Sequence, residues 1–360
     1  MAAAQPVDLV RELRGLRGSF GNFVDAKFLS VEEVDHCLKN QPNSVNEAGR
    51  RMIRYIKKTI PDDFLQLGIT LPITRLQHVT TEFSMRQIVQ SGYFDAGVST
   101  ILPSNLPKSK LSCWSVQIPQ EQIKEAQQEA FLVVQGMVPE NNAIEFEEKF
   151  NAQFANSPAF NDASRYGNFK FSLSLSDLLS EYKELHCPDS EPEFRVLGTA
   201  MYKQEIAHIV LVHSPTTTQF NDLPFVPIVE RNAKPLPFVF RSQEDGKLYW
   251  RPESTADNLK IRVFENQCRM RECPVNCPYY DYGRCLHYEE TFSVWNHLIF
   301  AFHLPENEPL RIPREKLKES LSACDILAPY MKEGRTYTRQ EAEEIIRSLE
   351  IKAAIKLHLL

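Results

Sequence analysis

Two groups of residues in this sequence have types and positions that could do chemistry. The first is His78 with two acidic residues, Glu193 and Glu205, which lie in the last predicted strands of the middle segment. A histidine and a carboxylate that a small sheet brings together could serve acid–base chemistry or nucleotide binding. The alternative is that His78 is a structural residue of a half-buried strand. The sequence alone leaves both readings open.

The second group is a cysteine-rich run, Cys268-x4-Cys273-x3-Cys277-x7-Cys285-x-His287. Thiolates and imidazoles suit Zn²⁺, which takes four nitrogen or sulfur ligands in a tetrahedron. The spacing departs from the common CxxC knuckle and from the usual RNA-binding finger of three cysteines and a histidine. We nevertheless expect a structural zinc site here, with ordinary buried thiols and a redox or other role as the alternatives.

Aromatic and basic residues surround these cysteines, namely Tyr279, Tyr280, Tyr282, Arg269, Arg271 and Arg284. Aromatic rings among cations are what proteins use to recognise single-stranded nucleic acid. In the other interpretation, which we favour, the tyrosines pack a small subdomain and the arginines face water.

The stretch from Thr74 to Gly97 must position His78. A predicted strand over residues 75–80 carries His78 near its end, and a threonine pair then offers a hydroxyl to cap a helix. Apolar residues recur at helical spacing after the cap, and Gly92 stands where a left-handed residue would end the helix. Strand ends hold side chains on a rigid frame while leaving them accessible, so His78 is in a position typical of a site.

The rest of the chain divides into three parts. Residues 1–66 are predicted to be helical, 67–215 to form a mixed α and β domain, and 216–360 to form an α+β region that includes the cysteines. Further strands are expected at 110–118, 169–175, 194–201 and 206–213, with helices at 119–131, 314–324 and 339–349. Asp245-Gly246 predicts a hairpin turn, and the polar stretch 139–168 predicts a long excursion or lid. The expected fold class is α+β.

The order of these pieces resembles the ADP-ribosyltransferases, in particular the DarT-type toxins that modify DNA and, more distantly, the poly-ADP-ribose polymerase-like transferases. These families open their core with a strand that carries His-x-Thr, followed by a helix and a Gly-plus-apolar stop. The matching residues here are His78-Val-Thr80, Ile88-Val-Gln-Ser-Gly92 and Phe94. The closing pair of strands matches at Glu193-Phe-Arg-Val196 and Ile206-Ala-His-Ile209-Val-Leu-Val212.

This resemblance implies that NAD is the substrate, that His78 contacts its ribose and nicotinamide amide beside Thr80, and that Glu193 is the catalytic carboxylate. Breaking the nicotinamide–ribose bond develops positive charge on the sugar, which a carboxylate stabilises only in the transition state. The resemblance also makes Arg165, Tyr166 and Phe171 candidates for clamping NAD, and it leaves Glu205 as the alternative carboxylate. If neither glutamate faces His78, the domain is expected to be a non-catalytic relative.

Composition bounds the remaining possibilities. The net charge of -6 gives no general attraction to nucleic acid or anionic membrane, and no apolar run is long enough to span a bilayer. The start of the chain lacks the pattern of a secretory signal, so we expect a cytoplasmic or nuclear protein with reduced cysteines and no membrane partner.

The chain as a whole is similar to the virus- and interferon-inducible proteins of fish, which implies a role in innate antiviral defence. The expected function is ADP-ribosylation of a macromolecule, with nucleic acid as a candidate acceptor; the alternatives are an inactive binding or regulatory protein on the same fold and a zinc-stabilised nucleic-acid-binding protein.

Overall fold

The structure is a computed structural model of the 360-residue chain. It describes residues 56–58, 69–96, 108–134, 159–160, 162–164, 166–202, 205–231, 237–252, 259–265, 280–281, 284–285, 288–293, 295–305, 308–326 and 337–358. Side chains are described for most of these residues. Strands β1, β13, β14, β15 and β16 are described by their backbone alone.

A seven-stranded mixed sheet organises the described part of the chain. Its strand order is β19-β7-β3-β5-β17-β9-β8. In that order the strands span Leu321–Ala323, Phe169–Ser174, Arg75–Thr80, Lys110–Gln117, Trp295–Leu304, Glu205–His213 and Glu193–Tyr202. The predicted strands of the middle segment are therefore confirmed, because β3, β5, β7, β8 and β9 all occur within about two residues of their expected bounds.

The two faces of this sheet bury different sets of side chains, as the period of two in a strand requires. On β5, for example, Trp114 and Val116 enter the large core, whereas Leu111 enters a smaller one on the opposite face. Helices cover the large core: α4 (Glu82–Ser91), α5 (Gln120–Val134), α7 (Leu175–His186), α8 (Arg314–Ser320) and α9 (Arg339–His358) each contribute buried residues to it. The smaller core is closed by Phe220, from the short 3-10 helix Thr218–Phe220.

Local signals account for several helix ends. The Thr81 hydroxyl accepts from the Ser84 backbone N–H at 3.5 Å, and α4 stops at Gly92, whose φ of 82° is left-handed. Thr338 and Glu341 form the reciprocal capping box expected at the start of α9. The helix predicted over 314–324 is shorter than expected, because the chain from Leu321 onward pairs with β7 as β19.

The predicted boundary at residue 215 does not separate two sheets. Strand β17, which begins at Trp295, lies between β5 and β9 and pairs with both, and β19 extends the same sheet at its other edge. The only described part of the segment predicted to be helical, Ile56–Lys58, forms strand β1 and pairs with β13 (Leu259–Glu265). That segment therefore contains at least one strand, because these residues hydrogen-bond to another strand rather than along a helix.

Smaller sheets flank the main one. The predicted hairpin at Asp245-Gly246 joins β11 (Val239–Ser242) to β12 (Leu248–Trp250) within a sheet of order β10-β11-β12-β2, where β10 is Ile228–Val229 and β2 is Leu71–Pro72. The other pairings are β13 with β16 (Tyr288–Ser293), β14 (Tyr280–Asp281) with β15 (Arg284–Cys285), β18 (Leu310–Arg311) with β4 (Tyr93–Phe94), and β20 (Asp325–Ile326) with β6 (Ala163–Ser164).

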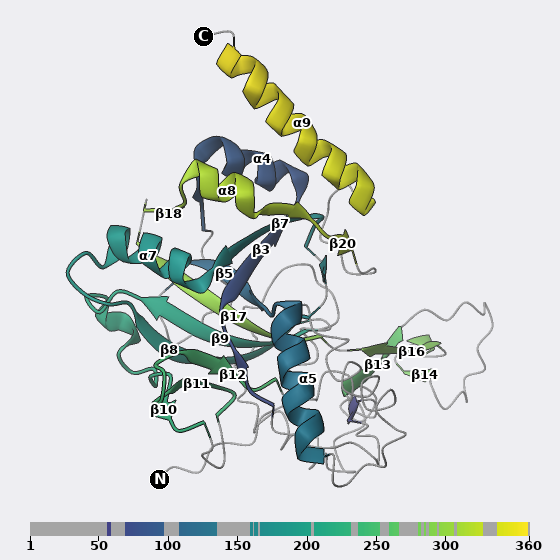
Figure 1. Ribbon diagram of the computed structural model, residues 1–360. Coiled ribbons are helices and arrows are strands. Elements are labelled where there is room, and N and C mark those ends of the chain that lie inside the picture. The colour runs from purple at the N-terminus through teal and green to yellow at the C-terminus, as the bar shows by residue number, and fades with distance from the viewer. Residues whose placement is uncertain are drawn as a thin grey trace.

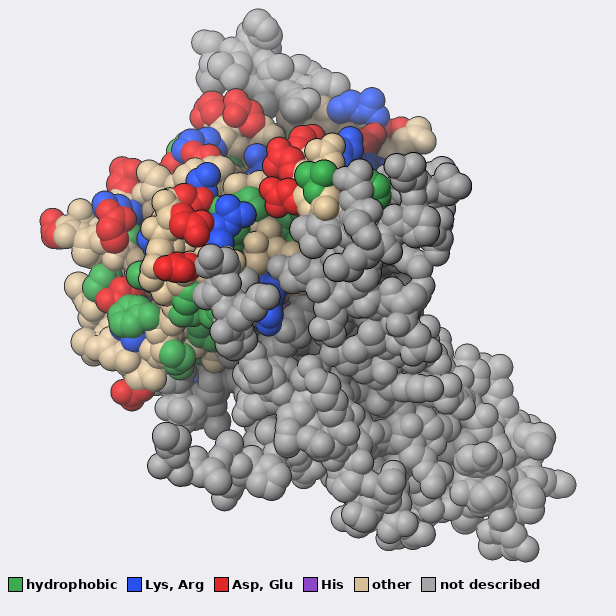
Figure 2. Space-filling model, turned by 60° about the horizontal axis from the view of Figure 1, so that its bottom comes forward, with side chains coloured by type: hydrophobic (Ala, Val, Ile, Leu, Met, Phe, Trp, Pro, Cys, Tyr) green, Lys and Arg blue, Asp and Glu red, His purple; other side chains and the backbone are tan. Residues whose placement is uncertain are grey.

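Figure 1 shows α4 and α8 side by side over one end of β3 and β7, with α9 projecting beyond them. Figure 2 shows the face seen when the bottom of that view is turned forward: within the coloured, described part, acidic and basic side chains are interspersed, and hydrophobic ones gather toward one side. This part of the surface therefore does not carry charge of a single sign, in keeping with the near balance of charges in the sequence.

Candidate functional site

The main sheet opens between β3 and β5. These two strands pair only from Arg75 to Gln77, opposite Gln117 to Ser115. Beyond that point β3 continues to Thr80 paired with β7 alone, while β5 continues back to Lys110 paired with β17. His78 is the first residue of β3 after the separation. It therefore stands where β3 and β5 part while both strands continue.

His78 is held by its neighbours in one tautomer. Its Nδ1 lies 3.0 Å from the backbone carbonyl oxygen of Cys113, which can only accept, so Nδ1 carries the proton. The ring lies edge-on to Phe94 and tilted against Trp114, with centroids 5.1 and 5.4 Å away. Burial lowers the pKa of the imidazole, and the hydrogen bond to Cys113 offsets this only in part. The ring is therefore neutral near pH 7. Its Nε2 carries a lone pair, and no hydrogen bond to this atom is found among the described residues.

The residues proposed to clamp NAD around His78 have different surroundings. Thr80 lies two residues along on the same face of β3 and is nearly buried. Phe171 is directly opposite His78 in the β3–β7 register but is fully buried against Phe94, so it supports the site rather than presenting a ring to a ligand. Tyr166 is 39% exposed beside Gly167, which contacts Thr80. Arg165 lies outside the described residues.

A turn from the predicted lid stretch packs against the end of β3. Gly167 has a φ of 148°, and a Cβ added to it would lie 2.0 Å from the Thr80 carbonyl oxygen. Only glycine lets two backbones approach so closely. The stretch 162–168 is thus in contact with the core where the structure describes it, and Tyr166 is the residue next to the glycine that touches Thr80.

Substitution of Gly167 by alanine is expected to lower the free energy of unfolding by about 2–3 kcal/mol, because the turn must move away from Thr80 or adopt a strained backbone. The matched control is Gly246→Ala: this glycine also has a positive φ, 70°, but a Cβ there would meet nothing within 4 Å. We expect it to cost only about 1 kcal/mol of backbone strain. Urea denaturation of both variants measures the difference, and equal costs would mean that the Thr80 contact is not tight.

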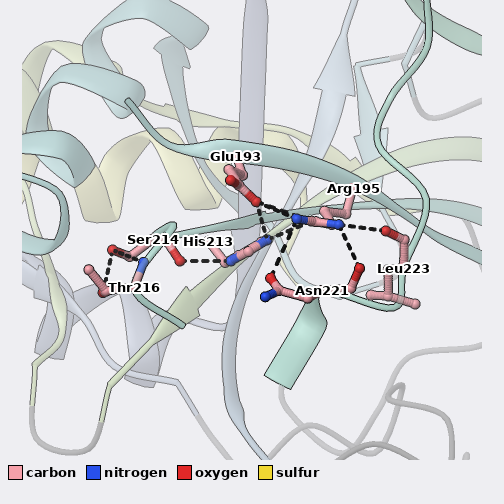
Figure 3. Close-up of polar contacts among 7 residues, drawn as sticks. All are labelled: Glu193, Arg195, His213, Ser214, Thr216, Asn221 and Leu223. Carbon is pink, nitrogen blue, oxygen red and sulfur yellow. Dashed lines mark hydrogen bonds and ion pairs between the residues drawn. The ribbon is translucent and has the colours of Figure 1, made fainter. Parts of the chain in front are cut away.

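Glu193 lies in a different polar cluster, which Figure 3 shows. Its Oε2 accepts from Arg195 Nη2 at 2.6 Å and Nε at 3.2 Å, and lies 3.4 Å from His213 Nε2. Arg195 Nη1 also donates to the carbonyls of Asn221 and Leu223, at 3.0 and 2.8 Å. The Glu193 carboxylate is thus the partner of a buried guanidinium that ties β8 to the segment after β9.

His213, at the centre of this cluster, is fully buried. Its Nδ1 lies 2.8 Å from the Ser214 carbonyl and so carries the proton, which leaves Nε2 to accept from Arg195 Nε at 3.2 Å. Burial is the main cause that lowers the pKa of His213. A neutral His213 therefore fits the network, whereas a protonated one would face the Arg195 cation.

The structure does not bring Glu193 and His78 together. They belong to the same sheet, but β5, β17 and β9 lie between their strands, a separation of four strand spacings or about 19 Å. The face that carries His78 can be followed through the paired residues Leu76–Val116, Trp114–Phe300, Phe300–Val210 and Val210–Val196. Glu193 is an odd number of residues from Val196, so it lies on the opposite face. The two side chains cannot form one site.

Glu205 does not replace it. This residue begins β9 at the end opposite to His213, paired with Tyr202 on β8 and Trp295 on β17. Two strands, β5 and β17, separate β9 from β3. The position of its backbone thus also keeps Glu205 away from His78.

The cysteine-rich run lies almost wholly outside the described residues. Cys268, Cys273, Cys277 and His287 are not described, and only the backbone of Cys285 is, as part of β15. Among the residues that the structure does describe, no group of three or more histidines, cysteines or carboxylates could hold a metal ion. The zinc site remains a prediction from the sequence.

No family model matches this chain, and neither curated proteins nor solved structures give a match. In the described part of the chain, no helix has the length and apolar character needed to cross a membrane.

Sequence reasoning missed several polar residues that the structure makes prominent. Arg195 stands between Phe194 and Val196 in a strand, and a charged residue with apolar neighbours in a buried strand is a signal of a specific partner. Asn168, described below, follows a glycine at the end of the polar stretch and gave no comparable signal.

Proposed function

We propose that this protein binds NAD at the opening between β3 and β5, on an ADP-ribosyltransferase-like core, and that Glu193 takes no part in the site. The observation that supports binding is the state of His78: a neutral ring, anchored through Nδ1, whose Nε2 can accept a hydrogen bond from a ribose hydroxyl. Aromatic side chains flank it on two sides.

The proposal is one of binding rather than turnover. Transfer of ADP-ribose needs a carboxylate beside the ribose, and Glu193 lies on the other face of the sheet with its carboxylate engaged by Arg195. A regulatory or sensing role in innate antiviral defence, with nucleic acid or protein as the macromolecular partner, is consistent with a nucleotide-binding domain of this kind.

Replacing His78 by alanine is expected to weaken NAD binding about tenfold, the worth of one good hydrogen bond together with the lost ring contacts. Isothermal titration of the full chain with NAD measures the dissociation constant. The matched variant is Glu193→Gln, which should lower thermal stability but leave NAD affinity within about twofold.

Each outcome discriminates. A wild-type chain that shows neither heat of binding nor a thermal shift with NAD would refute the proposal. If Glu193→Gln abolished binding without loss of stability, Glu193 would belong to the site in solution and the binding site proposed above would be wrong. Label transfer from radioactive NAD to RNA, single-stranded DNA or protein by the wild type, lost in Glu193→Gln, would establish the transferase.

A further inference from the structure

The turn that ends at Asn168 is held in place by residues far away in the sequence. The Asn168 side chain is 1% exposed, and its Nδ2 donates to the carbonyl oxygens of Cys324, at 3.0 Å, and Tyr337, at 2.9 Å. Its Oδ1 accepts from the Tyr337 backbone N–H at 2.9 Å. Both donor hydrogens and the acceptor of the amide are therefore used to join the turn to the C-terminal part of the chain.

Tyr337 reaches from this junction to the start of α4. Its hydroxyl donates to the carboxylate of Glu82, the first residue of that helix. Its ring packs edge-on against Phe169 at 6.0 Å between centroids. Glu82 is also held by Arg86, one turn along, at 2.6 Å. One tyrosine thus connects the turn and the β3–α4 junction, the two segments that meet at Thr80.

The start of α9 reinforces the same connection. Arg339 is ion-paired with Asp162 at 2.6 Å, and the Asp162 carboxylate also binds the buried Lys170 on β7. The pKa of Asp162 is lowered because Lys170 and Arg339 together outweigh the effect of burial. The docked end of α9 therefore contacts the polar stretch on both sides of Tyr166 and Gly167.

We propose that Asn168 and Tyr337 are positioning residues for the nucleotide site, through which docking of the C-terminal segment controls NAD affinity. They hold Gly167 against Thr80, and thereby Tyr166 beside the strand that carries His78. This inference rests on the proposed function, since it specifies how that same site is kept in its binding form. Release of Tyr337 from Glu82 frees the turn to move off β3 and weakens binding without touching the ligand itself.

The test is a double-mutant cycle of Tyr337→Phe and Glu82→Gln, with NAD affinity and amide hydrogen exchange of the full chain as readouts. Gln340→Ala is the control, because this residue is exposed on α9 and, within the described part of the chain, its side chain bonds to Glu344 of the same helix. We expect Tyr337→Phe to weaken NAD binding about fivefold and to speed exchange in the peptide that covers residues 162–168. Once Tyr337→Phe is present, Glu82→Gln should add little to the loss of affinity, because the hydroxyl–carboxylate contact is already gone and the Glu82–Arg86 pair, which the glutamine also weakens, lies within α4.

The outcomes separate this inference from the function on which it rests. If the wild type binds NAD and Tyr337→Phe binds it equally well, the positioning role is refuted while the proposed function stands. Equal effects of Tyr337→Phe and Gln340→Ala on affinity, or additive effects of the two cycle mutations, would also refute it. If the wild type binds no NAD, the proposed function fails and the positioning role fails with it.

Discussion

Replacing Arg195 by alanine is expected to lower the free energy of unfolding by about 3–5 kcal/mol, the range typical of breaking a buried ion pair from one side. Arg195 is 5% exposed, and its guanidinium donates to the Glu193 carboxylate, to His213 Nε2 and to the carbonyls of Asn221 and Leu223. Removing it leaves these acceptors without their donor in a place that water reaches poorly. The ring of Phe225, 3.7 Å from the guanidinium carbon, also loses its cation contact.

Two further variants make the cause identifiable. Arg195→Lys keeps the charge but cannot reproduce the fork of donors, so it should fall between the wild type and the alanine variant. Arg311→Ala removes an exposed arginine on β18 and should change stability by less than about 0.5 kcal/mol. Urea denaturation at pH 7 gives all three values. A cost below about 1 kcal/mol for Arg195→Ala would show that the cluster is solvated in solution.

The sequence paired His78 with Glu193, whereas the structure places Glu193 in the Arg195 cluster on the other face of the sheet. The motif around Glu193 predicted a strand, and β8 does begin at that residue. What a motif cannot give is the order of strands and the face to which each residue points, since both depend on contacts between distant segments. Here β17, from residue 295 onward, enters the sheet between β5 and β9 and moves Glu193 one strand farther from His78.

Local chemistry was far more informative. The β3–α4 unit was predictable because each of its boundaries has a local cause: the Thr81 cap, the apolar face with Met85 and Ile88, and the left-handed Gly92. Local signals in the sequence also account for helix α7, although this helix was not predicted. Ser174 caps it through the Asp177 N–H at 2.9 Å, and Leu175, Leu178 and Tyr182 recur at helical spacing.

The contacts that complete the candidate site have no such local cause. The position of the Gly167 turn depends on Asn168 bonding to residues more than 150 positions away. An asparagine after a glycine ordinarily indicates only a turn. The sequence could therefore identify His78 and Thr80 as residues of interest, whereas the elements that hold them in place required the three-dimensional structure.

Acid is expected to destabilise the protein well above the pH at which carboxylates titrate, because several of its histidines are buried in the neutral form. Burial is the first cause that lowers the pKa of His78, His186, His213 and His303, and it brings the pKa of His303 to about 4. Among the residues that the structure describes, none offers a hydrogen-bond partner to the buried His186 Nε2 or His303 Nδ1. Of the nearby charges, only the exposed Glu308, 3.3 Å from His186 Nδ1, and Glu193 beside His213 favour protonation.

The direction of this pH dependence follows from the number of protons that the folded and unfolded states bind. A histidine whose folded pKa is below its unfolded value of about 6.5 binds fewer protons when folded, so its contribution to stability is complete above pH 6.5 and is lost as the pH falls. For His303, a folded pKa of about 4 corresponds to roughly 3 kcal/mol lost between pH 6.5 and 4. Each of the other three adds a slope of up to about 1.4 kcal/mol per pH unit below pH 6.5.

Urea denaturation between pH 7.5 and 5 should therefore show a steep fall in the free energy of unfolding that begins near pH 6.5. His303→Gln is the informative variant, since glutamine stays neutral and can still accept from Gln219, which lies 3.4 Å from His303 Nε2. In the same pH window, the slope of its free energy of unfolding against pH should be smaller than that of the wild type by about 1.4 kcal/mol per pH unit, the slope that one proton contributes. An equally steep profile in the variant would show that His303 is already protonated in the folded protein, and hence that its end of β17 is open to water.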